Sequence, residues 1–172
     1  GGLCAGTAVV VRTLRPDGLV LGAEPKAVDD AARSMATGVR QPRVDGAKTW
    51  GDGLMTGLGE PNFALLVQHR VRIVTVEEQA MVDGARFFLE RMKAVVEPSA
   101  ATVLAAIRAI AGELRGQRIG LVLSGGNTDF AWLWISQLFA VQYLSGATMF
   151  ESDYKPGDWT RWTVNVSDED DG

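Results

Sequence analysis

Short apolar runs and longer amphipathic stretches alternate along the first 130 residues. Apolar runs at residues 19–23, 71–76 and 119–123 predict buried strands, since each is short and lies among glycine, proline or polar residues. Strands that are nearly all apolar and alternate with helices predict an α/β fold, with a parallel sheet between two layers of helices. The stretches that predict helices are residues 7–14, 28–37, 62–68, 78–92 and 98–114.

Local signals mark the ends and the buried faces of two of these helices. Thr75 with Glu78 predicts a capping box, and Pro98 suits the first position of a helix, where its missing N–H costs nothing. Gly116 is expected to end the second helix. The predicted core-facing stripes are Met81, Ala85, Phe88 and Met92 in the first helix, and Val103, Ile107, Ile110 and Leu114 in the second.

Composition excludes several classes of protein. The chain has 172 residues, 47% of them hydrophobic, which is enough for one domain with a core. Cys4 and His69 are the only residues of their types, so a disulfide framework and a zinc site with several soft ligands are excluded. A reducing, cytoplasmic setting fits this composition, and no signal peptide pattern opens the chain.

Charge and hydropathy set the last 42 residues apart. Residues 151–172 hold seven acids and two bases, a net charge of −5, which leaves about +1 for residues 1–150 and predicts no nucleic-acid partner. Residues 131–150 are apolar but interrupted by Ser136, Gln137, Gln142 and Ser145, so they predict a packed helix and no membrane span. Residues 131–172 are therefore expected to be a divergent aromatic and acidic tail.

Two N-terminal pieces carry possible chemistry. Glycines in residues 1–6 precede a helix and would let backbone N–H groups hold an anion, although a glycine-rich end also occurs without a ligand. Glu24, Asp29 and Asp30 surround a helix start, where carboxylates either bind a hard divalent cation or simply stabilise the helix dipole. From spacing alone, both alternatives stay open.

Two later pieces are equally ambiguous when taken singly. Glu97 follows an apolar run and precedes Pro98, so it either works as a buried carboxylate or caps the helix. Ser124 is expected at the end of the third strand, followed by two glycines and Asn127. That arrangement suits either a tight turn or a ligand site beyond the carboxyl end of the sheet.

The order of these pieces is more specific than any one of them. Gly-Gly-Leu, Glu-Pro-x-x-x-Asp-Asp, Asp-Gly, Glu-Pro-Ser and Leu-Ser-Gly-Gly-Asn follow one another over residues 1 to about 130. In this order they resemble the second half of the fold-type II pyridoxal-phosphate enzymes, in the serine/threonine dehydratase and serine racemase group. The resemblance implies an incomplete large domain of that α/β fold.

The resemblance assigns a cofactor role to particular residues. The glycines at the chain start match a phosphate-gripping loop, and Ser124 matches the hydroxyl that meets the pyridine nitrogen. Glu97 matches a carboxylate near the cofactor, and Gly53 belongs to a matching Asp-Gly segment. The cofactor-binding residues implied for pyridoxal 5′-phosphate are Gly1, Gly2, Leu3, Gly53, Glu97 and Ser124.

The resemblance also implies a cation, a reaction and an assembly. Glu24, Asp30 and the carbonyl of Val28 match the ligands of Mg²⁺ or another divalent cation in the serine racemase branch. The implied reaction is an ammonia-lyase (dehydratase) reaction that converts L-serine or L-threonine to a 2-oxo acid and ammonia, with serine racemisation as another outcome. The parent enzyme is expected to be a homodimer without membrane contact.

One departure from the family concerns the Schiff-base lysine. The family places it in a Ser-x-Lys-x-Arg-Gly stretch, and none of the four lysines of this chain has that context. We therefore expect a C-terminal fragment that is inactive alone, or alternatively a non-catalytic truncated paralogue that pairs with full-length subunits. A generic nucleotide-binding domain, with Glu24 contacting a ribose, explains fewer of the motifs. The four lysines are Lys26, Lys48, Lys93 and Lys155.

Overall fold

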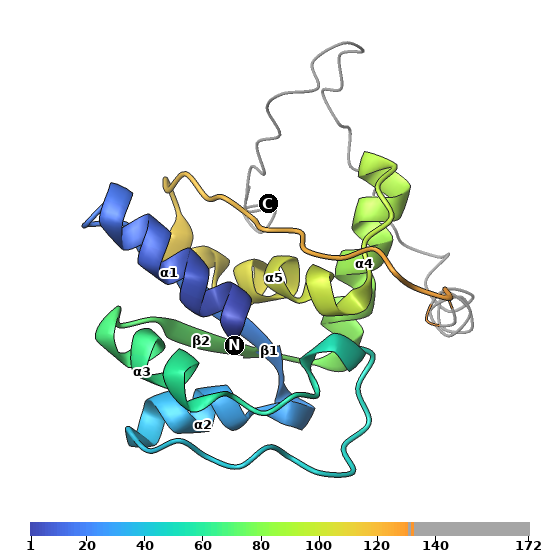
Figure 1. The fold of residues 1–172 in the computed structure, drawn as a ribbon. Helices are drawn as coiled ribbons and strands as arrows, with labels where there is room; N and C mark the ends of the chain where they lie inside the picture. Colours follow the sequence, from blue (N-terminus) through green and yellow to red (C-terminus); the bar gives the residue numbers. More distant parts are fainter. Residues whose placement is uncertain (131, 133–172) are drawn as a thin grey trace.

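The computed structural model describes residues 1–130 and 132, which form helices around a small parallel sheet (Figure 1). This part of the chain contains five α-helices, two strands and three short 3₁₀ helices. In chain order the elements are α1 (Gly2–Leu14), β1 (Leu21–Pro25), η1 (Lys26–Val28), α2 (Asp30–Thr37), η2 (Asp52–Leu54), α3 (Glu60–Gln68), β2 (Arg72–Val76), α4 (Glu78–Met92), α5 (Pro98–Ala109) and η3 (Ala111–Leu114).

The two strands pair in parallel, and helices cover both of their faces. Leu21 lies opposite Arg72, and the register continues to Pro25 opposite Val76. Ile73 packs with α1 and α3, whereas its neighbour Val74 packs with α4 and α5. Successive strand residues point to opposite faces, so this alternation produces the predicted layered α/β arrangement. The predicted fold class is confirmed.

Helix α5 is buried almost all round, because it lies between α4 and the sheet. The predicted stripe of this helix is largely wrong: of its four residues only Ile107 is buried, whereas Val103, Ile110 and Leu114 are half-buried. On α4, by contrast, three of the four predicted residues, Met81, Ala85 and Phe88, are buried, and Met92 is half-buried. The additional buried residues of α5 are Pro98, Ser99, Ala100, Ala101, Thr102, Leu104, Ala105 and Ala106.

The predicted third strand is wrong: residues 119–123 form no regular secondary structure. Ile119, Val122 and Leu123 are 44%, 47% and 38% exposed. A strand needs a neighbouring strand edge for its N–H and C=O groups. In the described part of the chain, Leu121 instead packs against residues of α4 and α5. Just after this segment, the N–H of Glu97 at the start of α5 donates to the carbonyl of Gly125.

Several predicted boundaries also differ from the structure. Helix α1 starts at Gly2 and not at residue 7, β1 lies two residues later than predicted, and α5 ends at Ala109 before the 3₁₀ turn η3. The Thr75–Glu78 capping box is wrong, because Thr75 belongs to β2. The Glu78 carboxylate accepts hydrogen bonds from Thr49 Oγ1 at 3.0 Å and from the Trp50 N–H at 2.8 Å.

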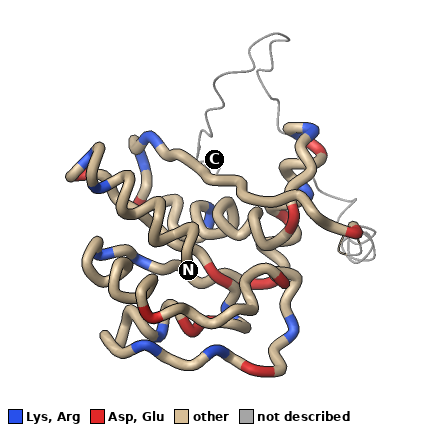
Figure 2. The backbone as a smooth tube through the Cα atoms, in the orientation of Figure 1, with Lys and Arg blue, Asp and Glu red and all other residues tan. Residues whose placement is uncertain are grey.

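The predictions for the tail fall almost wholly outside the described residues. Trp132 is the exception: it is 2% exposed and packs with Val82, Phe88 and Leu104. Among the described residues, no helix is long and apolar enough to cross a membrane. Figure 2 shows both charge signs scattered over the described elements.

Candidate functional site

The first turn of α5 brings together pieces that lie far apart in the sequence. Glu97 occupies the N-cap position, but its side chain makes no capping hydrogen bond. Instead, its Oε2 accepts a hydrogen bond from the Asn127 N–H at 3.1 Å, while its own N–H donates to the Gly125 carbonyl at 3.1 Å. Side-chain capping, the alternative left open for Glu97, is therefore wrong. The carboxylate holds residues 125–127 against the helix start.

Two glycines permit this close approach. A Cβ at Gly125 would overlap the carboxylate of Glu97, and a Cβ at Gly126 would lie 2.6 Å from the Val95 carbonyl oxygen. The Glu97 side chain can adjust, but the backbone oxygen of Val95 can move only with its peptide. The glycine pair is thus required by tertiary contact and not by an unusual backbone angle, because neither residue has a positive φ.

The Gly126→Ala substitution is expected to push residues 124–127 away from α5. We expect a loss of about 1–3 kcal/mol in the free energy of unfolding, the usual cost of forcing extra atoms into a packed contact. Gly120→Ala is the matched control, since no atom lies within 4 Å of the added Cβ in the same segment. Thermal unfolding measures both variants. Equal effects would contradict the assigned contact.

Gly53 approaches the same helix turn from a third segment. Its N–H donates to Ser99 Oγ at 3.1 Å, and the Ser99 hydroxyl donates to Asp52 Oδ1 at 3.1 Å. A Cβ at Gly53 would lie 3.9 Å from Glu97 Oε1. Parts of three predicted motifs therefore meet at this helix turn. Gly53 comes from η2, Glu97 from the start of α5, and Gly125 and Asn127 follow Ser124. Ser124 itself is exposed beside Gly125.

The predicted phosphate residues lie at the start of α1. Gly1 is the N-cap, and the first helical hydrogen bond runs from the Ala5 N–H to the Gly1 carbonyl at 3.0 Å. The N–H groups of the first turn have no acceptor within the helix, and among the residues that the structure describes no side chain caps them. Gly1 lies against Leu58 and Asn62, whereas Glu97 lies against Gly125 and Asn127. The described contacts therefore do not join the predicted phosphate residues to the residues around Glu97.

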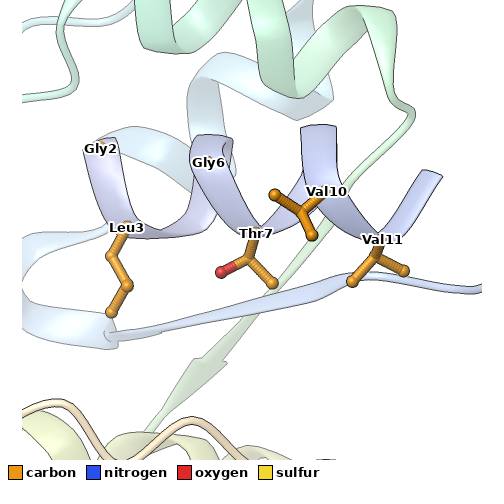
Figure 3. A pocket seen from close by; sticks show the side chains of 6 residues that line it. All are labelled: Gly2, Leu3, Gly6, Thr7, Val10 and Val11. Carbon is orange, nitrogen blue, oxygen red and sulfur yellow. The ribbon is translucent and has the colours of Figure 1, made fainter. Parts of the chain in front are cut away.

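An apolar hollow runs along the outer side of α1 (Figure 3). Leu3 and Val10 in its wall are 58% and 55% exposed. The hollow contains no titratable side chain, so it offers apolar contact but no acid or base. Its lining residues are Gly2, Leu3, Gly6, Thr7, Val10 and Val11.

Glu24 and Asp30, the predicted cation ligands, lie buried around the start of α2. Glu24 accepts hydrogen bonds from the Ala32 N–H at 2.5 Å and the Ala31 N–H at 3.4 Å, and Asp30 Oδ2 accepts from the Leu58 N–H at 2.9 Å. The described residues contain no cluster of three or more His, Cys, Asp or Glu side chains that could hold a metal. Cation binding would therefore rely on backbone carbonyls such as that of Val28.

Burial changes the acidity of Glu24. Desolvation raises the pKa of this carboxyl from 4.5 to about 7, and the negative charges of Asp30 and Asp29 add to the rise. The N–H groups of Ala32 and Ala31 act in the opposite direction. Glu24 is only 8% exposed, so its carboxylate is not presented to a ribose. This finding argues against the nucleotide-binding alternative.

Sequence reasoning missed the partners that hold the predicted site residues. Ser99 belongs to the Glu-Pro-Ser motif, but the sequence does not show that its hydroxyl contacts Gly53. Leu58 contributes a backbone N–H to Asp30, and no residue type signals that contact. Asn127 belongs to the Leu-Ser-Gly-Gly-Asn motif, but its backbone N–H and not its side chain donates to Glu97.

Comparison with known proteins places this arrangement in a family. The sequence profile of the family described as "Pyridoxal-phosphate dependent enzyme" matches residues 1–125. The chain is 42% identical over 130 residues to an L-threo-3-hydroxyaspartate ammonia-lyase from Pseudomonas sp, covering 75% of this chain and 40% of the relative. It is 38% identical to a serine racemase from Schizosaccharomyces pombe, with the same coverage.

Solved structures agree with these sequence matches. A threonine deaminase from T.th. is 44% identical and aligns with a TM-score of 0.72, over 76% of this chain and 48% of that protein. A maize serine racemase is 32% identical, with a TM-score of 0.70 over 84% of this chain and 45% of the other. The chain thus spans about 40% of the length of the curated relatives it matches.

Proposed function

The chain belongs to the family of pyridoxal-phosphate dependent enzymes, and we propose that it contributes the cofactor-holding part of an amino-acid ammonia-lyase or racemase. The proposed substrates are L-serine, L-threonine and, from the names of two relatives, L-threo-3-hydroxyaspartate. The proposed products of the lyase reaction are a 2-oxo acid and ammonia.

One observation carries this proposal. Gly53, Glu97 and the segment after Ser124 come from three separate parts of the sequence and meet at the first turn of α5. Each belongs to one of the motifs that together resemble the family. Hydrogen bonds and close contacts, rather than sequence neighbourhood, bring these pieces together, as a preorganised site requires.

The residues present suit the chemical groups of pyridoxal phosphate. The first-turn N–H groups of α1 would hold the phosphate, since a helix N-terminus favours an anion. The exposed hydroxyl of Ser124 would hydrogen-bond the pyridine nitrogen without carrying a charge of its own. Glu97 would keep Ser124 in place through Gly125 and Asn127. The bound cofactor would supply an electron sink for the substrate carbanion.

We also propose a divalent cation at Glu24, Asp30 and the carbonyl of Val28. Both carboxylates are buried and lie close enough for the charge of Asp30 to raise the pKa of Glu24. A hard cation with oxygen ligands, such as Mg²⁺, would offset this mutual repulsion. The homodimer implied by the family resemblance stays a prediction.

Turnover by the product of the complete reading frame that encodes this chain tests the reaction. We expect release of a 2-oxo acid from at least one of the three proposed substrates, together with a pyridoxal phosphate absorbance band that shifts when substrate is added. Formation of D-serine would indicate racemisation. If neither activity nor the band appears, the alternative of a non-catalytic paralogue that pairs with full-length subunits replaces the proposed enzyme function.

Binding of pyridoxine 5′-phosphate to this chain tests the cofactor residues separately. This probe keeps the phosphate and the ring nitrogen but lacks the aldehyde, so it cannot form an imine with surface lysines. Ser124→Ala is expected to weaken binding about 3- to 10-fold, the usual effect of losing one hydrogen bond. Thr13→Ala, which removes an exposed hydroxyl far along α1, is the control. Unchanged affinity in Ser124→Ala would refute the assigned contact.

A further inference from the structure

We propose that Ser99 is a positioning residue, which fixes the Asp52–Gly53 segment beside Glu97 at the first turn of α5. The inference rests on the proposed function in so far as Gly53 and Glu97 face the cofactor. Ser99 itself need touch neither cofactor nor substrate. Its hydroxyl acts on both sides, accepting from the Gly53 N–H and donating to Asp52 Oδ1, each at 3.1 Å.

The 3₁₀ turn that Ser99 holds has little anchorage of its own, whereas the preceding residues Thr49 and Trp50 are hydrogen-bonded to Glu78. None of the three residues of η2, Asp52–Leu54, is buried. Apolar burial therefore contributes little to the position of this turn. Asp52 also accepts a hydrogen bond from the Gly53 N–H at 2.7 Å, which shapes the turn but does not attach it to the rest of the protein. The Ser99 hydroxyl supplies the polar attachment.

The position of Ser99 in α5 restricts the movement of its hydroxyl. Ser99 is only 9% exposed and follows Pro98, which starts the helix. The Cβ position of Gly53 is 3.1 Å from Ser99 Oγ, so a larger residue there would press on the hydroxyl. Glu97 Oε1, two residues earlier in the chain, lies 3.9 Å from the same Cβ position. Ser99 thus sets how Gly53 approaches Glu97.

The first test is amide hydrogen exchange in the full 172-residue chain. Ser99→Ala is expected to speed exchange at the Gly53 amide about 3- to 10-fold, because its outside acceptor is lost. Ser99→Thr keeps the hydroxyl and should restore exchange to within about twofold of the original chain. Thr102→Val, which removes another buried hydroxyl one turn further along α5, is the matched control.

A merely structural role would give a different pattern. Faster exchange throughout α5, or the same change in Thr102→Val, would overturn the proposal, as would an unchanged Gly53 amide in Ser99→Ala. If Ser99→Ala fails to fold, Ser99→Cys decides, because its thiol keeps the size of the side chain, is a weak acceptor and leaves the Asp52 contact to Gly53 intact. We expect at least about twofold faster exchange at Gly53 in that variant, and an unchanged rate overturns the proposal.

Binding of pyridoxine 5′-phosphate separates this inference from the proposed function. If the original chain binds the probe, Ser99→Ala should weaken binding about 3- to 10-fold, and equal affinity would overturn the positioning role. If the original chain does not bind, the cofactor proposal for this chain fails, whereas the exchange rate at Gly53 still decides the role of Ser99.

Discussion

Replacing Trp132 with alanine is expected to lower the free energy of unfolding by about 3–5 kcal/mol, the range for truncating a large buried aromatic residue. Trp132 is 2% exposed and packs with Val82, Phe88 and Leu104. Its indole N–H also donates to Thr128 Oγ1 at 2.7 Å. Denaturant unfolding of the full chain measures the change.

Two further variants separate packing from hydrogen bonding at this position. Trp132→Phe keeps most of the apolar contact and loses the indole N–H, so we expect a loss of about 1–2 kcal/mol. Thr128→Ala removes the acceptor of the indole N–H, which also accepts a longer hydrogen bond from the Phe130 N–H at 3.3 Å, and the expected loss is about 1 kcal/mol. A loss below about 1 kcal/mol in Trp132→Ala would contradict the observed burial. We expect the loss of stability to be largest in Trp132→Ala, smaller in Trp132→Phe and smallest in Thr128→Ala.

Stability is expected to fall as the pH rises from about 4.5 to 7, because of Glu24. Burial raises the pKa of this carboxyl from 4.5 to about 7 in the folded protein, so folding favours its protonated form. The contribution is fully present below pH 4.5 and is lost as the pH passes 7. The expected loss is about 1–3 kcal/mol. Urea unfolding between about pH 4.5 and 8 measures it.

Glu24→Gln is the matched variant for this pH dependence, because glutamine has the shape of the protonated acid and does not titrate. We expect the fall in stability to be smaller by the same about 1–3 kcal/mol in this variant. An identical pH profile for both proteins would contradict the assignment to Glu24. Carboxyl groups distant from Glu24 contribute equally to both profiles, so the difference reports Glu24 together with its charge interaction with Asp30 and Asp29.

The proposed cation adds a second arm to the experiment. Mg²⁺ would bind the ionised carboxylates of Glu24 and Asp30, so millimolar MgCl₂ should stabilise the protein more at about pH 8 than at about pH 5. The stabilisation should disappear in Glu24→Gln. Equal stabilisation at both pH values, or in both proteins, would mean that Mg²⁺ acts elsewhere and would refute the proposed cation site.

The sequence alone determined the fold class and the family. Alternation of apolar runs with amphipathic stretches indicated the α/β arrangement, because strands and helices place side chains with different periods. Pro98 marked the start of α5 correctly, and the stripe of Met81, Ala85 and Phe88 identified the buried face of α4. The order of the short motifs identified the family, which the matching profile confirms.

The tertiary structure alone decided what each predicted residue contacts. Residues 119–123 are as apolar as the two segments that do form strands, yet they form none. A strand also requires a neighbouring strand edge, which the local sequence does not encode. Glu97 meets the Asn127 N–H, and Ser99 meets the Gly53 N–H. Both partners are backbone groups, which every residue except proline carries, so no pattern of residue types reveals them.

The same reason explains Glu24 and Trp132. The raised pKa of Glu24 depends on how completely the surrounding residues exclude water, and the burial of Trp132 depends on its packing with residues of both α4 and α5. Desolvation and packing are sums over neighbours that are distant in the sequence. The order of residue types therefore identified the elements and the family, whereas the chemistry of individual side chains was decided by which backbone and side-chain atoms folding placed beside them.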